Sequence, residues 1–111
     1  MRILVVDDNA QNVLNLSMAL RREGYEVVST TDGLEALQMV KRLKPALVLL
    51  DILMPVHDGI EIGMRLKEDP LTREVPVIFL TALTGAREVE TMSFDSDKLV
   101  GAIRQVVQRA A

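Results

Sequence analysis

Ile3-Leu4-Val5-Val6-Asp7-Asp8 sets two acids directly after four consecutive apolar residues. The same arrangement returns twice, where the apolar run 47–50 leads into Asp51 and the run 77–80 leads into Thr81. Short apolar runs separated by helical patterns are typical of parallel strands that are buried on both faces. Ligands of an open parallel sheet bind beyond the carboxyl ends of its strands. We therefore expect these three acids and one hydroxyl to converge at one edge of a sheet.

Helical patterns fill the intervals between the runs. Residues 10–23 carry apolar side chains at helical spacing, with Asn9 or Asp8 as the cap and Gly24 at the end. A second short strand is expected over residues 25–29. Such strand–helix alternation with short connections implies right-handed crossovers and helices on both faces. The sequence predicts an α/β fold in three layers, a doubly wound parallel sheet.

Two further helices follow from the turn signals. One begins at Asp32-Gly33 and stops at Pro45, and another runs from Asp58-Gly59 to about Lys67. The residues expected to face inward are Leu34, Leu37, Val40 and Leu43 in the former helix, and Ile60, Met64 and Leu66 in the latter.

Length and composition limit the classes of protein. The 111 residues suffice for a single domain, 1–111. The net charge of -3 argues against a general affinity for nucleic acid or anionic membrane. The chain has no cysteine, and no apolar stretch approaches the roughly 18 residues of a membrane span. We expect a cytoplasmic protein.

The expected cluster of acids indicates a metal site. Carboxylates gathered at one point repel each other unless a cation lies among them, and Mg²⁺ prefers oxygen ligands. Asp7, Asp8, Asp51 and the main-chain carbonyl of Leu53 are the candidate ligands. Asp51 could also act as a nucleophile toward phosphorus, and the Thr81 hydroxyl could donate to a phosphoryl oxygen. The pattern therefore favours phosphoryl chemistry, which depends on positioning and charge neutralisation.

Taken together, Leu4-Val5-Val6-Asp7-Asp8-Asn9, Leu49-Leu50-Asp51-Ile52-Leu53-Met54-Pro55 and Phe79-Leu80-Thr81-Ala82 closely resemble the receiver domain of two-component response regulators. The resemblance covers the chain to about residue 86 and resumes over 94–107. It implies a flavodoxin-like sheet of strand order 2-1-3-4, with Asp51 as phospho-acceptor and Thr81 as the phosphoryl contact. A histidine kinase or phosphotransfer protein would be the donor, and a downstream protein effector would read the result. On this reading the chain is an acceptor and not an enzyme.

The chain departs from that family near its end. Receivers usually have a fifth strand that ends in Lys-Pro, and here it is missing or degenerate: residues 83–95 are atypical, and 96–110 resemble the final helix. Without that strand the fourth strand becomes an exposed edge, and such edges invite pairing with another chain. We therefore expect a homodimer through residues 76–111. An omitted loop or an engineered deletion would also account for the gap.

Two other functions fit parts of the sequence. A pseudo-receiver would bind partners, or dimerise, without phosphotransfer, which suits the apparent lack of the lysine. An aspartate-nucleophile phosphatase would need a second acid two residues after Asp51, where this chain has Leu53. Phosphotransfer onto Asp51 with Mg²⁺ is therefore the leading hypothesis.

Overall fold

A computed structural model of the chain describes residues 1–52, 54 and 58–80. Strands and helices alternate along it: β1 (Arg2–Val6), α1 (Ala10–Arg22), β2 (Glu26–Thr30), α2 (Gly33–Leu43), β3 (Leu47–Leu50), α3 (Gly59–Glu68) and β4 (Val77–Phe79). The four strands form one sheet in the order β2-β1-β3-β4, and each neighbouring pair is parallel. This confirms the strand order 2-1-3-4.

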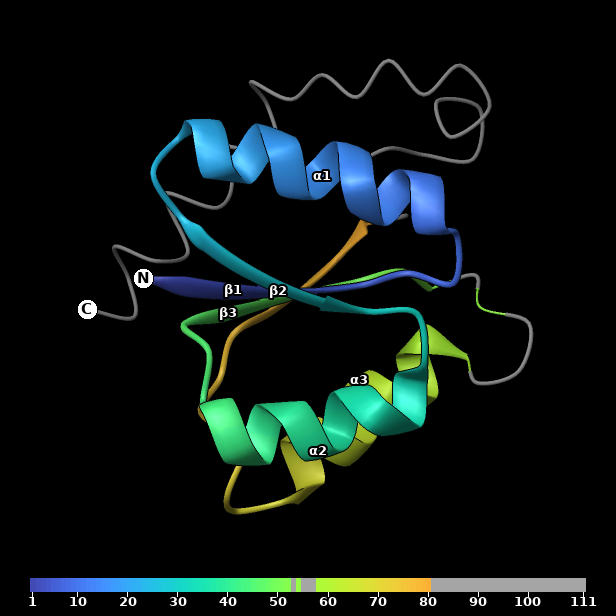
Figure 1. Cartoon of the computed structure of the whole chain (residues 1–111). Helices are drawn as coiled ribbons and strands as arrows, with labels where there is room; N and C mark the ends of the chain where they lie inside the picture. Colours follow the sequence, from blue (N-terminus) through green and yellow to red (C-terminus); the bar gives the residue numbers. More distant parts are fainter. Residues whose placement is uncertain (53, 55–57, 81–111) are drawn as a thin grey trace.

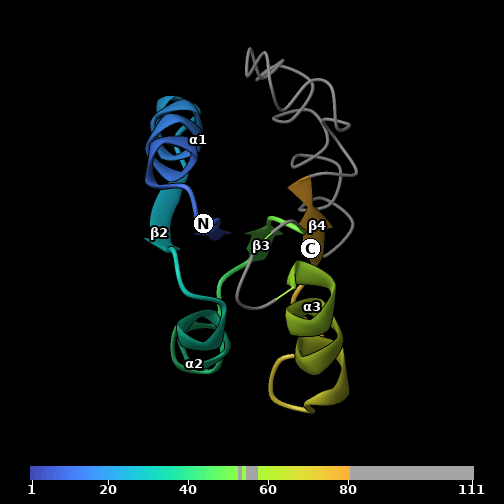
Figure 2. The same ribbon diagram turned by 90° about the vertical axis from the view of Figure 1, so that its right-hand side faces the viewer.

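The helices cover the sheet from both sides. Figure 1 shows α1 above the sheet and α2 with α3 below it. In the view turned by 90°, β2 and β4 lie at opposite edges of the sheet, with β3 between them (Figure 2). The predicted three-layer, doubly wound architecture is therefore confirmed for the part of the chain that the structure describes.

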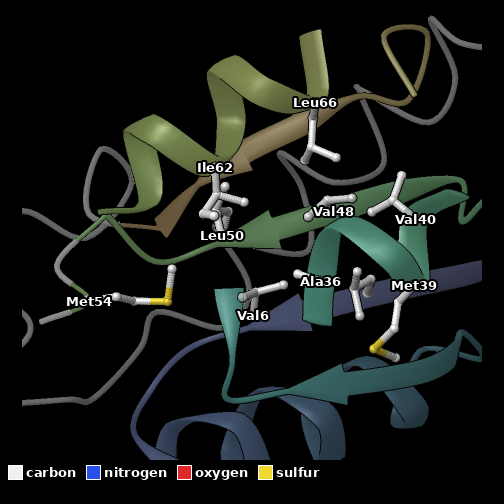
Figure 3. Close-up of a cluster of buried hydrophobic side chains, with 10 residues drawn as sticks. Val6, Ala36, Met39, Val40, Val48, Leu50, Met54, Ile62 and Leu66 are labelled. Carbon is white, nitrogen blue, oxygen red and sulfur yellow. The ribbon is translucent and has the colours of Figure 1, made fainter. Parts of the chain in front are cut away.

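Successive residues of a strand point to opposite faces, so each strand contributes to two cores. The core under α1 consists of Ile3, Val5, Leu16, Leu20, Val27, Leu47, Leu49 and Leu80. The core on the other face, drawn in Figure 3, consists of Leu4, Val6, Ala36, Met39, Val40, Val48, Leu50, Met54, Ile62 and Leu66. Every residue of β3 is buried, which explains why its sequence is continuously apolar.

The helix ends follow from local chemistry. Asn9, not Asp8, caps α1, and its side chain accepts hydrogen bonds from the main-chain N–H groups of Gln11 and Asn12. Gly24 follows the helix with a φ of 92°, a conformation that glycine adopts without strain. Helix α2 ends at Leu43, and its cap, Lys44, has a left-handed conformation just before Pro45.

The predicted inward face of α3 was right for Leu66 and wrong for Ile60 and Met64. Ile60 and Met64 are exposed (47% and 57%), whereas Ile62 and Leu66 are buried. Two apolar pairs with the same spacing compete in this helix, and the glycines decide between them. A Cβ at Gly63 would lie 2.6 Å from the ring of Phe79, so the glycine face is the one that approaches the sheet.

Two smaller expectations also need correction. Leu34 is exposed, because Gly33, Ala36 and Val40 form the buried face of α2. The second strand begins one residue later than predicted and extends to Thr30. Tyr25 does not join it, since its main-chain N–H donates to the carbonyl of Leu20 at the end of α1.

Strand β4 forms an edge of the described sheet, and its residues are only half-buried. The degenerate fifth strand, the atypical residues 83–95 and the final helix at 96–110 lie outside the described residues, and these remain predictions. Within the described residues, no helix has the length and apolar character needed to cross a bilayer.

Candidate metal centre

The parallel strands hold the three acids at the carboxyl edge of the sheet. The main-chain N–H of Asp7 donates to the carbonyl of Thr30 on β2 (3.3 Å), which ties the end of β1 to its first neighbour. The main-chain N–H of Asp51 donates to the carbonyl of Val6 (2.9 Å), which ties the end of β3 to β1. These two hydrogen bonds set the main-chain positions of Asp7 and Asp51, and thereby the points from which their side chains extend.

Asp7, Asp8 and Asp51 lie within reach of a shared cation. One carboxylate oxygen from each residue can be chosen such that all three lie within 4.8 Å of one another. Mg²⁺ binds oxygen at about 2.0–2.1 Å, so opposite ligands lie roughly 4 Å apart. The three carboxylates therefore need only small adjustments to share one ion, and retained waters would complete its shell.

The three acids differ in their access to solvent. Asp7 is almost fully buried (3% exposed), Asp51 is half-buried, and Asp8 is exposed. A buried carboxylate is costly unless its charge is compensated. The cluster thus has one acid that gains most from a bound cation, and one, Asp51, that a second molecule can reach.

Burial also changes the acidity of Asp7. It raises the pKa of this carboxyl to about 7, and the negative charge of nearby Asp51 acts in the same direction. Two hydrogen bonds oppose this shift by favouring the ionised form. The main-chain N–H of Asn9 donates to Asp7 Oδ1 (2.9 Å), and the side-chain amide of Asn12 donates to Asp7 Oδ2 (3.3 Å).

The residues present fit a hard divalent cation. All three side chains offer carboxylate oxygen, the ligand type that suits Mg²⁺ and Ca²⁺. Two neighbouring acids, one of them buried with a raised pKa, are the arrangement that a cation would relieve. The chemistry of these ligands therefore fits a site for a hard divalent cation.

The turn after Asp51 is held by α3 and by the core. The carbonyl of Ile52 accepts hydrogen bonds from the main-chain N–H groups of Met54 (3.1 Å) and Gly59 (3.0 Å). The Met54 side chain is buried in the core drawn in Figure 3. A Cβ at Gly59 would overlap the main-chain carbonyl of Asp51, so only glycine lets the helix begin this close.

The structure brings together the three predicted acids but does not describe every predicted site residue. Leu53 and Thr81 lie outside the described residues, so their roles stay predictions. Sequence reasoning missed Asn12, whose amide reaches Asp7 across the first turn of α1. An amide five residues after an acid at a strand end was the available signal, and it is a weak one.

Comparison with known proteins agrees with this fold. A family model for the response regulator receiver domain matches residues 3–100. Response regulator PleD of Caulobacter vibrioides is 49% identical over 84 residues, which cover 76% of this chain and 18% of that protein. DNA-binding response regulator MtrA of Mycobacterium tuberculosis is 42% identical over 88 residues, or 79% of this chain and 37% of that protein.

Solved structures extend the likeness to the fold. The N-terminal domain of a response regulator receiver protein from Methanoculleus marisnigri has a TM-score of 0.69 and 42% identity, covering 70% of this chain and 63% of that one. The signal receiver domain of a histidine kinase from Syntrophus aciditrophicus has a TM-score of 0.82 and 27% identity, covering 96% and 89%.

The doubly wound parallel sheet, with acids at its carboxyl edge, defines an α/β domain of the flavodoxin-like class. More narrowly, the chain belongs to the response regulator receiver domain family of two-component systems. It spans only a part of the curated relatives named above.

Proposed function

We propose that this receiver accepts a phosphoryl group on Asp51 and that the modification changes its affinity for a protein partner. The observation that carries the proposal is the meeting of three carboxylates from two strands, with Asp51 half-buried and Asp8 exposed beside a buried Asp7. Asp51, the proposed acceptor, is accessible to a phosphoryl donor, whereas Asp7 is buried and held by two hydrogen bonds.

Each residue of the site would have a separate role in phosphoryl transfer. Asp7, Asp8, Asp51 and the main-chain carbonyl of Leu53 would hold Mg²⁺. When bound, this ion supplies positive charge that offsets the charge of the incoming phosphoryl oxygens. A carboxylate oxygen of Asp51 attacks phosphorus, the phosphorus–nitrogen bond of a phosphohistidine breaks, and the imidazole leaves with a proton. Thr81 would donate its hydroxyl to a phosphoryl oxygen in the product.

The partners follow from the family. Response regulators receive their phosphoryl groups from histidine kinases or phosphotransfer proteins, and this chain would do the same in the cytoplasm. The acyl phosphate would then change the binding of a downstream protein effector. In this scheme the chain is an acceptor with, at most, self-catalysed phosphotransfer and dephosphorylation. Binding of nucleic acid by the chain itself is not part of the proposal.

One sequence observation favours a second function. No lysine occurs between Lys67 and Lys98, so the ammonium that usually contacts the phosphoryl group in this family has no evident counterpart. Arginine is not an equivalent replacement at such a position. A pseudo-receiver that binds partners or dimerises without phosphorylation is therefore the alternative.

Phosphorylation by a small donor separates the two functions. The protein would be incubated with Mg²⁺ and acetyl phosphate, and its intact mass measured. We expect one added phosphoryl group in the native chain and in Asp32→Asn, and none in Asp51→Asn. Asp32 is a matched control, because it is an exposed aspartate that caps α2, where asparagine caps equally well. No added mass in the native chain would favour the pseudo-receiver.

A further inference from the structure

Asn12 forms a direct contact with the buried acid of the metal centre. It lies in the first turn of α1 and is half-buried. Its side-chain Nδ2 donates to Asp7 Oδ2 at 3.3 Å, while the main-chain N–H of Asn9 donates to Asp7 Oδ1 at 2.9 Å. Both oxygens of one carboxylate are therefore held, each by a different donor.

Two donors on opposite oxygens do what one donor cannot. A carboxylate held at a single oxygen can still rotate about its Cβ–Cγ bond, because that torsion is broad. A second hydrogen bond at the other oxygen fixes the plane of the group. The plane of Asp7 decides which of its lone pairs face Asp8 and Asp51, since each carboxylate oxygen has more than one acceptor site.

Asn12 is itself well placed to act in this way. Its main-chain N–H donates to the side-chain oxygen of Asn9, the cap of α1 (3.1 Å). The same cap residue therefore aligns the first turn of the helix and supplies one of the donors to Asp7. The position of the Asn12 amide is thus set by the helix start and not by a flexible loop.

We infer that Asn12 is a positioning residue for the cation site, which orients the Asp7 carboxylate toward the ion shared with Asp8 and Asp51. This inference rests on the proposed function only in taking that site to bind Mg²⁺. Groups that hydrogen-bond to metal ligands are commonly worth about 10–100-fold in metal affinity. Because the contact is a long one, we expect an effect near the lower end, about tenfold.

The test compares Mg²⁺ affinity in the native chain, Asn12→Leu and Asn15→Leu by isothermal titration calorimetry, without any phosphoryl donor. Leucine has a similar size but lacks the amide donor. Asn15 is a matched control on the same helix, exposed and bonded to Gln11 but not to Asp7. Measurements at about pH 8.5, well above the range of an ordinary carboxyl, keep the acids ionised. We expect about tenfold weaker binding in Asn12→Leu and native affinity in Asn15→Leu.

A second measurement separates orientation from general damage. The rate of modification by acetyl phosphate would be followed as a function of Mg²⁺ concentration. A positioning role predicts that Asn12→Leu needs more Mg²⁺ for half-maximal rate but reaches the native rate at saturation. A disturbed fold would lower the saturated rate as well, and that result would overturn the inference.

The native protein offers a third readout. The side-chain amide signals of Asn12 in a ¹⁵N-labelled sample should shift when Mg²⁺ is added, and those of Asn15 should not. Native affinity in Asn12→Leu would overturn the inference and leave the proposed function intact. If the native chain binds Mg²⁺ but Asp51 is not modified, the proposed function is overturned and the inference about Asn12 stands. A native chain that binds no Mg²⁺ would overturn both.

Discussion

Gly59 approaches the main chain of Asp51 so closely that no side chain fits between them. A Cβ at this position would overlap the Asp51 carbonyl and lie 2.7 Å from Ile52 Cα. The first residue of α3 is therefore in direct contact with the backbone of the proposed phospho-acceptor. Whatever moves the start of this helix also moves Asp51.

Gly59→Ala should destabilise the protein and impair the site together. The added methyl group meets main-chain atoms, which cannot move aside cheaply, so we expect a loss of about 1–3 kcal/mol in the free energy of unfolding. Gly63→Ala is the matched control, because its Cβ would meet the Phe79 side chain, which can shift. Urea unfolding gives the stability, and modification by acetyl phosphate reports on Asp51. Equal effects of the two substitutions would contradict the close contact at Gly59.

The raised pKa of Asp7 predicts that the metal-free protein loses stability as the pH rises. The unfolded chain releases this proton near pH 3.8, whereas burial delays its release in the folded chain to about pH 7. The unfolded state thus binds fewer protons across this window, and the free energy of unfolding falls as the pH increases. Urea unfolding with EDTA at several pH values would measure the slope. Asp7→Asn should flatten it, and parallel slopes in the two proteins would contradict the prediction.

The affinity for Mg²⁺ should depend on pH through the same Asp7 carboxyl. The ion needs the ionised carboxylate, so binding below about pH 7 must displace a proton from Asp7. We expect the apparent affinity to rise with pH and to level off above pH 7. Calorimetry in two buffers of different ionisation enthalpy would count the released protons. Proton release that does not change with pH would indicate that Asp7 is already ionised in the metal-free protein.

The buried face of α3 can be tested with one pair of variants. Leu66 is fully buried, so Leu66→Ala should cost about 2–5 kcal/mol in the free energy of unfolding. Met64 is exposed, so Met64→Ala should change it by no more than about 0.5 kcal/mol. Urea unfolding of both variants would measure this difference. A larger cost at Met64 would mean that the helix is rotated.

Strand β4 gives a prediction about assembly. It has one neighbour, β3, in the described sheet, and its residues are only half-buried. We expect two copies of the chain to associate through residues 76–111, because an exposed strand edge offers unpaired main-chain groups. Sedimentation equilibrium across the micromolar range would detect a dimer. A monomer at every concentration would rule this out.

Residues 3–6 and 47–50 show what could be predicted from the sequence. Both runs are apolar throughout because each strand is covered on two faces, and this pattern alone located the strands and the acids that follow them. The inward face of α3 could not be predicted in the same way. Ile60 and Met64 have the same spacing as Ile62 and Leu66, and only the contacts of the glycines with the sheet distinguish the pairs.

The site, like the fold, could be predicted only in part from the sequence. The order of strands in a parallel sheet brings Asp7, Asp8 and Asp51 to one edge, so their convergence followed from sequence. The unequal burial of the three acids did not, since it depends on the three-dimensional surroundings of each carboxylate. The contact between Asn12 and Asp7 depends on the exact path from β1 into α1, which no sequence pattern specifies.

The hydrogen bonds from Asp51 to Val6 and from Asp7 to Thr30 have a consequence for how such a domain diversifies. All three acids and their main-chain supports belong to the first 51 residues, on the adjoining strands β2, β1 and β3. Substitutions after α3 can therefore leave these main-chain hydrogen bonds in place, whereas the start of α3 cannot change freely, because Gly59 contacts the main chain of Asp51.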